Sequence, residues 1–399
     1  MQKFETIVLG LGAMGSASLY QLAKRGTAVL GIDRFTPPHS FGSTHGGTRI
    51  TRVAIGENEQ YTLLARRSHE VWRAIEAETG ESLLTANGCL VISSDAPRAP
   101  THVEGFFENT VAAAGRYGIP HERLNAQEIR SRFPAYKARD NEKAFFEPGG
   151  GFLRVEKCVA ANLALARKYG AEIHNNEKVL RFAQNAGGVT VTTDRGSYTA
   201  DRLVIAAGAW LPELIGERYR VPFKVLRQVQ YWFDVDGSIE PYLSENFPVF
   251  LWELQGKPQS IYGFPAIDGP GGGFKLATEQ YSVETTADTV NREVTPQETE
   301  AMFRDYVAPY FKNASHRCLK SRVCLYTNVA GARFIIDQHP EHERVTVVSA
   351  CSGHGFKHSA AIGEVVAQLV TGGEPGIDLS SFKLDVTPTI VVPAKAGTQ

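Results

Sequence analysis

One stretch near the beginning of the chain, residues 5–35, constrains the fold more than any other. An apolar run is followed by a glycine turn, a helical segment, a second apolar run and an acid. This order, with the turn spaced G-x-G-x-x-G, is typical of a βαβ unit that binds a dinucleotide. Gly10 permits the tight turn, Gly12 lets a pyrophosphate approach the backbone, and Gly15 allows the helix to pack on the strand. Asp33 can accept hydrogen bonds from a ribose. The alternative is a glycine-rich turn in another kind of α/β sheet.

Length and composition narrow the class of protein. The chain has 399 residues, which predicts two domains rather than one core. A hydrophobic content of 43%, a charged content of 21% and a net charge of −1 are ordinary for a globular protein and predict no nucleic-acid partner. No apolar run is long enough to cross a bilayer, and the first strand begins too early for a signal peptide to precede it. We therefore expect a cytoplasmic protein without a membrane partner.

The cysteines support the same compartment. There are five, an odd number without C-x-x-C spacing, which argues against a disulfide framework and against a structural zinc site. We expect no metal. From the residues alone, a buried cysteine such as Cys89, Cys158 or Cys324 is most simply a small hydrophobic side chain.

Two later segments repeat the strand-to-glycine pattern of the beginning. Residues 202–210 form an apolar strand that ends in small residues around Gly208, where a cofactor can approach the backbone. Residues 345–357 form another strand, followed by a turn with Gly353 and Gly355 and then a helix, whose N–H groups suit a negative group. Both segments are predicted to rejoin the first sheet.

The expected fold class is therefore α/β, with a discontinuous Rossmann-like domain and a second domain built on an antiparallel sheet with helices. We assign residues 1–82, 146–220 and 321–386 to the nucleotide-binding domain, residues 83–145 and 221–320 to the substrate domain, and residues 387–399 to a flexible tail. The substrate domain is expected to be antiparallel because its apolar runs are rich in aromatic and β-branched residues and lie close together.

Two local signals predict particular elements. Thr295 with Glu298 three residues later is the pattern of a capping box, so a helix should begin there. Asn87-Gly88 within an alternating apolar stretch predicts a hairpin or strand pair.

Three basic residues are candidates for a site. Arg49 and Arg52 follow a loop rich in glycine and hydroxyl groups. If this segment is helical, they share a face and require an anion or a ring system between them; two solvated surface arginines are the alternative. Lys275 lies in the aromatic region and either faces a pocket or is an ordinary strand-edge lysine.

Several motifs in one order identify a family. They are Gly42–Arg49, Tyr262–Pro265, Val323–Thr327, Phe334–Asp337, His339–His342 and Ser352–Lys357. Together they resemble the monomeric sarcosine oxidase and N-methyltryptophan oxidase family over nearly the whole chain except its last dozen residues. The resemblance implies a monomeric enzyme that binds FAD covalently through a cysteine sulfur, and the matching residue is Cys324.

The resemblance also implies roles for individual residues. Arg52 and Lys357 match the pair that holds the substrate carboxylate, and Tyr262 matches a tyrosine of the substrate pocket. Arg49 and Lys275 match basic residues against the flavin, with the lysine tied to oxygen activation. We therefore predict Arg49, Lys275 and Tyr262 as catalytic. The predicted cofactor-binding residues are Gly10, Gly12, Gly15, Asp33, Ser43, Thr44, Val179, Gly208, Cys324, Gly353, His354, Gly355 and Lys357.

Three positions depart from the family pattern. Gly47 replaces an acid in the arginine loop, Glu279 replaces a histidine four residues after the lysine, and His358 stands where an aromatic residue is usual. Because these positions border the substrate pocket, they put sarcosine itself in doubt. The predicted function is an FAD-dependent oxidase of secondary, N-methylated amino acids, which uses oxygen and releases an aldehyde, a primary amine and hydrogen peroxide. The alternatives are an oxidase or dehydrogenase of a cyclic imino acid and a flavin-binding protein without turnover.

Overall fold

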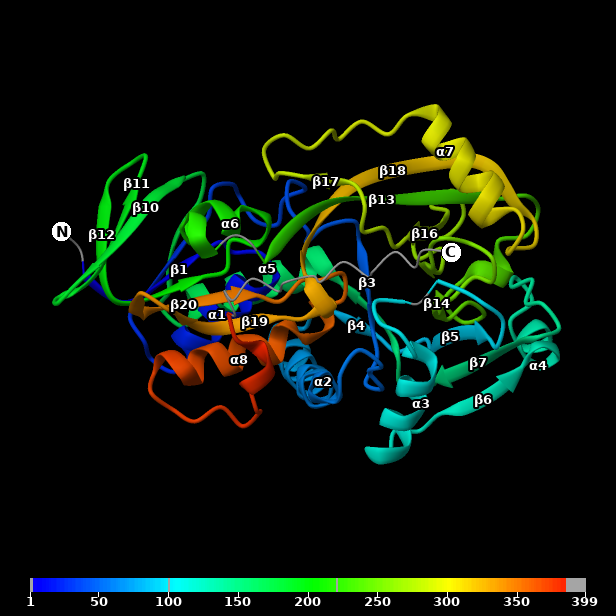
Figure 1. Cartoon of the computed structure of the whole chain (residues 1–399), viewed down its shortest axis with the longest axis horizontal. Coiled ribbons are helices and arrows are strands. Elements are labelled where there is room, and N and C mark those ends of the chain that lie inside the picture. Colours follow the sequence, from blue (N-terminus) through cyan, green and yellow to red (C-terminus); the bar gives the residue numbers. More distant parts are fainter. Residues whose placement is uncertain (1–2, 100, 220–221, 385–399) are drawn as a thin grey trace, which may run out of the picture.

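The computed structural model describes residues 3–99, 101–219 and 222–384. Two large sheets and a small one form its framework (Figure 1). The predicted α/β class is confirmed. The predicted tail lies outside the described residues, and the domain boundaries stay a prediction.

The first sheet has eight strands and a parallel centre. Its strands are β1 (Lys3–Leu9), β2 (Val29–Ile32), β9 (Glu172–His174), β10 (Val179–Asn185), β11 (Gly188–Thr193), β12 (Ser197–Ile205), β19 (Ile335–His339) and β20 (His342–Ser349). β1 pairs in parallel with β2 and β12, β2 with β9, and β12 with β20. β12 and β20, which contain the strand parts of the two later segments, thus lie in the first sheet, as the sequence predicts.

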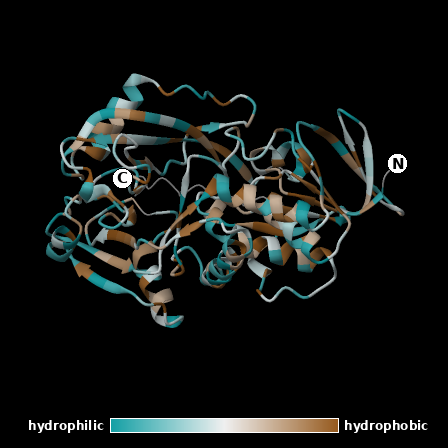
Figure 2. Cartoon of the chain, turned by 180° about the vertical axis from the view of Figure 1, so that it is seen from behind, coloured by the Kyte–Doolittle hydropathy of each residue, from teal (hydrophilic) through white to brown (hydrophobic). Residues whose placement is uncertain are grey.

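Helices cover one face of this sheet. They are α1 (Ala13–Lys24), α2 (Glu59–Thr79), α5 (Val155–Lys168) and α8 (Ser359–Val370), and their buried residues form one apolar core with the sheet. At the parallel centre of the sheet, β2 and the second half of β1 are apolar and buried because both of their faces are covered. In Figure 2 hydrophobic residues gather on the strands and inner helix faces, while hydrophilic residues predominate in the outer loops.

The second sheet is largely antiparallel, and two of its strands, β13 and β18, are much longer than the others. It contains β5 (Cys89–Ser94), β6 (Glu122–Asn125), β7 (Glu142–Glu147), β13 (Phe223–Val235), β14 (Val249–Trp252), β15 (Ile261–Phe264), β16 (Phe274–Thr278), β17 (Glu284–Thr285) and β18 (Ala314–Val329). β13 and β18 pair along nearly their whole length. The helices beside this sheet are α3 (Phe106–Arg116), α4 (Ala126–Arg132) and α7 (Pro296–Met302).

A three-stranded sheet and short turns complete the chain. The small sheet consists of β3 (Thr48–Thr51), β4 (Leu84–Thr85) and β8 (Gly151–Arg154). The short helical segments are α6 (Leu211–Leu214), η1 (Gly208–Trp210), η2 (Glu217–Tyr219), η3 (Glu240–Tyr242), η4 (Phe303–Val307), η5 (Ala330–Ala332), η6 (Phe356–His358) and η7 (Ser380–Phe382).

The two local signals have different outcomes. Thr295 and Glu298 form the predicted capping box at the start of α7. The predicted hairpin at Asn87-Gly88 is wrong, because β4 pairs with β8 whereas β5 pairs with β7 and β14. The Gly88 N–H instead donates to the carbonyl of Gly150, so the turn joins two sheets rather than two neighbouring strands.

Candidate active site

A large cavity lies at the carboxyl ends of the parallel strands. Leu9 and Gly10 after β1, Asp33 after β2, Ala206 after β12 and Ala350 after β20 all line it. Ligands of open parallel sheets bind at this edge, where the helix N-termini and strand ends meet. The cavity continues between the two sheets, where Leu251, Tyr262, Phe264 and Glu279 from the second sheet line it.

The first glycine turn has the shape of a phosphate cradle. A Cβ on Gly10 would lie 2.7 Å from the Ala206 carbonyl oxygen, and one on Gly15 would lie 1.7 Å from the Gly10 carbonyl oxygen, so neither position tolerates a side chain. At Gly12 the nearest atom would be Thr44 Oγ1 at 3.5 Å, which leaves open space before the N-terminus of α1. Free N–H groups at a helix N-terminus attract phosphate.

Asp33 closes this turn from the next strand. Its Oδ2 accepts a hydrogen bond from the Leu11 N–H at 2.7 Å, and its Oδ1 accepts one from the Phe35 N–H at 2.8 Å. Ser43 Oγ is buried and has no hydrogen-bond partner among the described residues, and Ser43 lines the cavity. A hydroxyl without a partner beside an open helix N-terminus fits a phosphate ligand.

Arg49 and Lys275 meet beside the small sheet. Arg49 lies on β3, so the conditional helical arrangement of Arg49 and Arg52 is wrong; its guanidinium donates to the carbonyls of Thr48 and Ser43. Lys275 lies on β16, an inner strand between β13 and β15, and is buried, which excludes the strand-edge alternative. Its Nζ donates to the carbonyls of Gly46 and Thr48 at 2.9 and 3.0 Å.

The charge of Lys275 has no carboxylate beside it among these contacts. Burial, and then the neighbouring Arg49, hold the pKa of Lys275 well below its usual range. The pKa of His45 in the adjacent loop is lowered to about 3, chiefly by burial and then by Arg49. Two basic side chains and a neutral histidine thus meet at this corner, and the acid that acts on Lys275 there is Glu156, which accepts from the N–H groups of the same loop.

Cys324 lies on β18, opposite Gln228 of β13, and is buried. Gln230 Nε2 donates to its Sγ at 3.5 Å. Burial raises the pKa of the Cys324 thiol, while Arg49 and Lys275 act in the opposite direction. Cys324 does not itself line the cavity, although Tyr326 on the same strand and Cys351 after β20 do.

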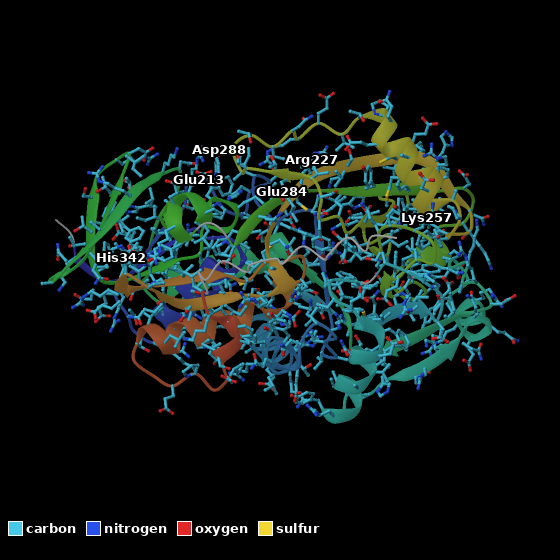
Figure 3. The ribbon with its side chains drawn as sticks, viewed as in Figure 1. Glu213, Arg227, Lys257, Glu284, Asp288 and His342 are labelled. Carbon is cyan, nitrogen blue, oxygen red and sulfur yellow. The ribbon has the colours of Figure 1, made fainter. Side chains whose placement is uncertain are left out.

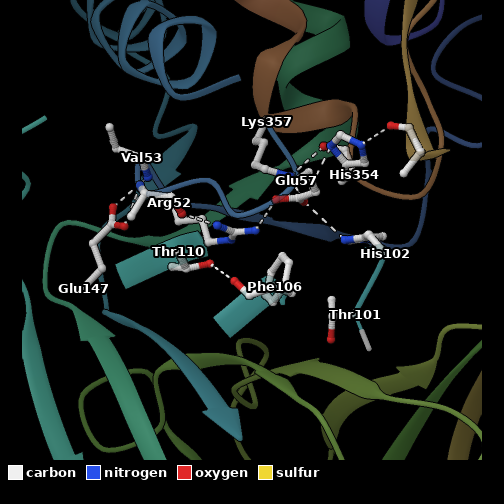
Figure 4. Close-up of polar contacts among 12 residues, drawn as sticks. Arg52, Val53, Glu57, Thr101, His102, Phe106, Thr110, Glu147, His354 and Lys357 are labelled. Atoms are coloured by element: carbon white, nitrogen blue, oxygen red, sulfur yellow. Dashed lines mark hydrogen bonds and ion pairs between the residues drawn. The ribbon is translucent and has the colours of Figure 1, made fainter. Parts of the chain in front are cut away.

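A buried ionic cluster lies at the other end of the pocket (Figure 4). Arg52 Nη2 lies 2.9 Å from Glu57 Oε2, and Lys357 Nζ lies 3.8 Å from Glu57 Oε1. Arg52 is only 1% exposed, so the alternative of a solvated surface arginine is wrong. Arg52 also donates to the Ala54 carbonyl, and Lys357 donates to the His354 carbonyl at 2.7 Å.

The backbone around Arg52 is fixed by a second acid. Glu147 at the end of β7 accepts hydrogen bonds from the N–H groups of Val53 and Ala54 at 2.7 and 2.9 Å. The Arg52 guanidinium also lies over the Phe106 ring, 4.9 Å from its centroid. These contacts hold the guanidinium in one orientation at the cavity wall.

The sequence did not reveal that Glu57 and His102 belong to the cluster, nor that Glu279 contacts it. Glu57 and His102 carry no motif, and Glu279 was known only as a departure. His102 lies between the two acids, with Nδ1 3.2 Å from Glu57 Oε1 and Nε2 2.9 Å from Glu279 Oε1. The left-handed backbone at His102, with a φ of 58°, was the remaining signal, and it is visible only in the structure.

The two other departures have simple structural explanations. The N–H groups of Gly46 and Gly47 both donate to the carboxylate of Glu156 on α5. The arginine loop, which has glycine in place of an acid at position 47, thus contacts an acid on a neighbouring helix. The His358 ring packs against Tyr61 and Phe334 at 5.6 and 5.5 Å, and burial holds its pKa well below the usual range. His358 is therefore a neutral aromatic ring.

Most of the predicted residues converge on the cavity. Those that line it are Gly10, Gly12, Asp33, Ser43, Thr44, Arg49, Arg52, Val179, Gly208, Tyr262, Gly353, His354, Gly355 and Lys357. Gly15, Lys275 and Cys324 lie behind its wall. Gly355 resembles Gly15, because a Cβ there would lie 1.6 Å from the Ala350 carbonyl oxygen. The roles of these residues stay predictions.

Comparison with known proteins decides the family. The model of the family described as FAD dependent oxidoreductase matches residues 5–369. The chain belongs to this family of FAD-dependent oxidoreductases. The oxidoreductase is 40% identical over 380 residues to monomeric sarcosine oxidase of Streptomyces avermitilis, which covers 95% of this chain and 96% of that protein. It is 35% identical over 385 residues to N-methyl-L-tryptophan oxidase of Yersinia pestis, covering 96% of this chain and 98% of that protein.

Solved structures agree on the fold of this oxidoreductase. NikD, an amino acid oxidase of nikkomycin biosynthesis, superposes with a TM-score of 0.82 at 23% identity, covering 96% of this chain and 98% of that one. Glycine oxidase from Geobacillus kaustophilus gives a TM-score of 0.75 at 20% identity, covering 96% and 99%. The predicted family, fold and FAD cofactor are thus confirmed. None of the helices in residues 3–99, 101–219 and 222–384 is long and apolar enough to cross a membrane.

Proposed function

We propose that this oxidoreductase oxidises secondary, N-methylated amino acids with oxygen. The observation that carries the proposal is the pair of buried cations, Arg52 and Lys357, which line the same cavity as the phosphate cradle. The 34–40% identity to sarcosine oxidases and the 35% identity to N-methyl-L-tryptophan oxidases support the same substrate class.

The pocket is suited to hold an amino acid in one orientation. Arg52 and Lys357 each have N–H donors left after their contacts with Glu57, Ala54 and His354, and these donors bind the substrate carboxylate. The hydroxyl of Tyr326 donates to that of Tyr262 at 3.2 Å, so the phenols form a fixed wall. Burial raises the pKa of Tyr262, which therefore stays protonated.

FAD, when bound, accepts two electrons and a hydrogen from the carbon next to the substrate nitrogen and passes the electrons to oxygen. The imine takes up water and gives the aldehyde and the primary amine, and oxygen with two electrons and two protons gives hydrogen peroxide. Gly10, Gly12, Asp33, Ser43 and Thr44 hold the nucleotide, with Gly15 supporting the turn. Further along it, Val179, Gly208 and the Gly353–Gly355 turn complete the contacts. Arg49 and Lys275 stabilise the negative charge that develops nearby.

We infer further that Cys324 forms a thioether with a methyl carbon of the flavin. The bond removes the thiol hydrogen and one methyl hydrogen, with oxygen as the final electron acceptor. Burial raises the pKa of the Cys324 thiol, and the cations Arg49 and Lys275 oppose that rise and so reduce the cost of forming the thiolate. The test is acid precipitation of the purified protein. Yellow colour should stay with the pellet and move to the supernatant in Cys324→Ser, while Cys351→Ser, the cavity-lining control, should keep it in the pellet.

A substrate panel tests the activity. Peroxide release should be measured with N-methylglycine, N-methyl-alanine, N-methyl-tryptophan, proline and pipecolate. Oxidation of N-methyl compounds above the cyclic acids supports the proposal; oxidation of cyclic acids alone would replace it, and no peroxide from any compound would refute it. We also propose a cytoplasmic monomer, which light scattering of the purified protein and fractionation of cells would check.

A further inference from the structure

Glu57, His102 and Glu279 form a row of alternating charge along one end of the cavity, to which the proposed mechanism assigns no role. The three residues come from the loop before α2, the loop before α3 and the segment after β16, and each is at most 5% exposed as a residue or side chain. Glu279 Oε2 also accepts a hydrogen bond from Ser260 Oγ at 3.2 Å. Both His102 and Glu279 line the cavity.

The position of His102 favours its charged form. Each ring nitrogen lies within 3.2 Å of a carboxylate oxygen, close enough for ion pairs although neither nitrogen makes a well-aligned hydrogen bond among the described residues. Burial opposes the charge, but Glu279 and Glu57 outweigh burial and raise the pKa of His102 to about 9. The ring lies beside the cofactor turn, where a Cβ at Gly353 would come within 3.2 Å of Nε2, so glycine at this position leaves room for the imidazole.

The charges at this end of the cavity leave room for one anion. Among the side chains in direct ion-pair contact, three cations face two acids: Arg52, Lys357 and His102 against Glu57 and Glu279. Glu147 accepts only the backbone N–H groups of Val53 and Ala54, and burial raises its pKa. His354 lies 3.6 Å from Glu57, but burial holds its pKa well below the usual range, so its ring is neutral. The buried tyrosines Tyr262 and Tyr326 stay protonated because burial raises both pKa values. The five side chains in ion-pair contact thus carry a net charge of +1, which matches a single carboxylate.

We propose that Glu279 and His102 determine the substrate class of this site, restricting it to amino acids with one carboxylate. This inference rests on the proposed function and deepens it. The substrate carboxylate uses the single excess positive charge, so a side chain that carries a second anion meets Glu279 on an apolar wall with Leu251, Tyr262 and Tyr326. In such surroundings a like charge is repelled much more strongly than in water.

Two four-carbon acids test this directly. Butyrate has one carboxylate and succinate has two, and neither has an amine that the enzyme could oxidise. Binding to the purified flavoprotein at pH 7 is measured from the perturbation of flavin absorbance. Butyrate should bind at least about tenfold more tightly than succinate. Glu279→Gln should reduce this ratio to about threefold or less, and Glu300→Gln, an exposed glutamate on α7, should leave it unchanged.

A second variant keeps the test decisive. His102→Gln removes a cation and should weaken butyrate by about tenfold, whereas a merely structural role would leave the acid affinities of the folded variant unchanged. Three results would overturn the inference: the two acids bind equally, Glu279→Gln leaves the ratio of their affinities unchanged, or neither acid binds. Peroxide release with N-methylglycine is measured alongside. If it persists while the ratio is 1, only this inference fails; if it is absent for all amino acids, the proposed function fails.

Discussion

The Lys275 amine is buried, its hydrogen-bond acceptors are all neutral oxygens, and burial holds its pKa well below the usual range. Its Nζ lies 5.3 Å from the centroid of the Trp232 ring, and Lys320 lies 4.8 Å from the same ring. Burial disfavours the charge on Lys275, so a nearby anion that forms during the reaction would be stabilised strongly. Lys320 is exposed and its charge is already solvated.

We therefore expect Lys275→Met to slow the reaction of the reduced protein with oxygen by about 100-fold or more, with a much smaller effect on reduction by substrate. Stopped-flow absorbance measures the two half-reactions separately. Lys320→Met is the matched control and should change neither rate by more than about twofold. Equal losses in both half-reactions would remove the role that we give to Lys275.

The pH dependence of carboxylate binding is also set by single residues. Burial, and to a smaller degree Arg52, lower the pKa of Lys357 to about 8 although Glu57 opposes them, and the pKa of His102 is about 9. Binding needs the protonated forms, so butyrate affinity should fall as the pH rises from about 8 to 10. In Lys357→Arg the guanidinium stays charged, so the loss of butyrate affinity near pH 8 should disappear and the loss near pH 9 should remain. A constant affinity over this range would contradict the assignment.

At the scale of elements, the helix layer depends on the close contact of α1 with α8. A Cβ on Gly363 of α8 would lie 2.5 Å from the backbone carbon of Ala17 in α1. Because α1 begins at the phosphate cradle and α8 follows the second glycine turn, this contact also sets the distance between the two turns. A side chain at Gly363 must therefore separate the helices or strain them.

We predict that Gly363→Ala lowers the free energy of unfolding by about 1–3 kcal/mol, as overpacking does in close-packed cores. Thermal unfolding followed by circular dichroism measures the change. Gly115 in α3 is the control, since a Cβ there meets nothing within 4 Å and its φ is not left-handed. Gly115→Ala should be neutral or slightly stabilising through helix propensity. A stable Gly363→Ala protein would show that the helices adjust freely.

Local signals and long-range contacts differ in how well a sequence reveals them. The capping box of α7 depends on four neighbouring residues, and the sequence predicted it correctly. The turn at Asn87-Gly88 has the composition of a hairpin, but its pairing partners lie on β7, β8 and β14, and no local pattern contains them. Tertiary pairing decided the outcome there.

For the molecule as a whole, the cofactor half of the site was predictable and the substrate half was only partly so. The glycine turns and Asp33 have fixed spacings, because each follows a strand of one parallel sheet. The row of Glu57, His102 and Glu279 is assembled from three distant loops, and no spacing connects its members. The sequence therefore predicted that Arg52 and Lys357 lie at the cavity but gave no signal for Glu57 or His102 beside them.

The same long-range assembly joins the two sheets at the cavity edge through Asp288. Arg34, after β2, donates to both carboxylate oxygens of Asp288 at 2.8 and 2.9 Å, and Trp210, after β12, donates to Oδ1 at 2.8 Å. Asp288 follows β17 of the second sheet. Figure 3 shows it near Glu213 of α6, a helix that follows β12 of the first sheet. Both Arg34 and Trp210 line the cavity.

We predict that Asp288→Asn speeds hydrogen exchange in residues 285–293 by about fivefold, or about 1 kcal/mol. Arg34 Nη1 donates to both carboxylate oxygens in a pair that is 32% and 41% exposed, and the Trp210 N–H bond adds to this partly screened contact. Mass spectrometry of the exchanged protein measures this. Glu284→Gln, which breaks the exposed pair with Lys224 in the neighbouring stretch, should change exchange by less than about twofold, because exposed pairs contribute little. The Trp210 hydrogen bond and Arg34 lower the pKa of Asp288, so the contact should weaken as the pH falls through that lowered pKa. Equal exchange in the two variants would show that the sheets are held together by apolar packing alone.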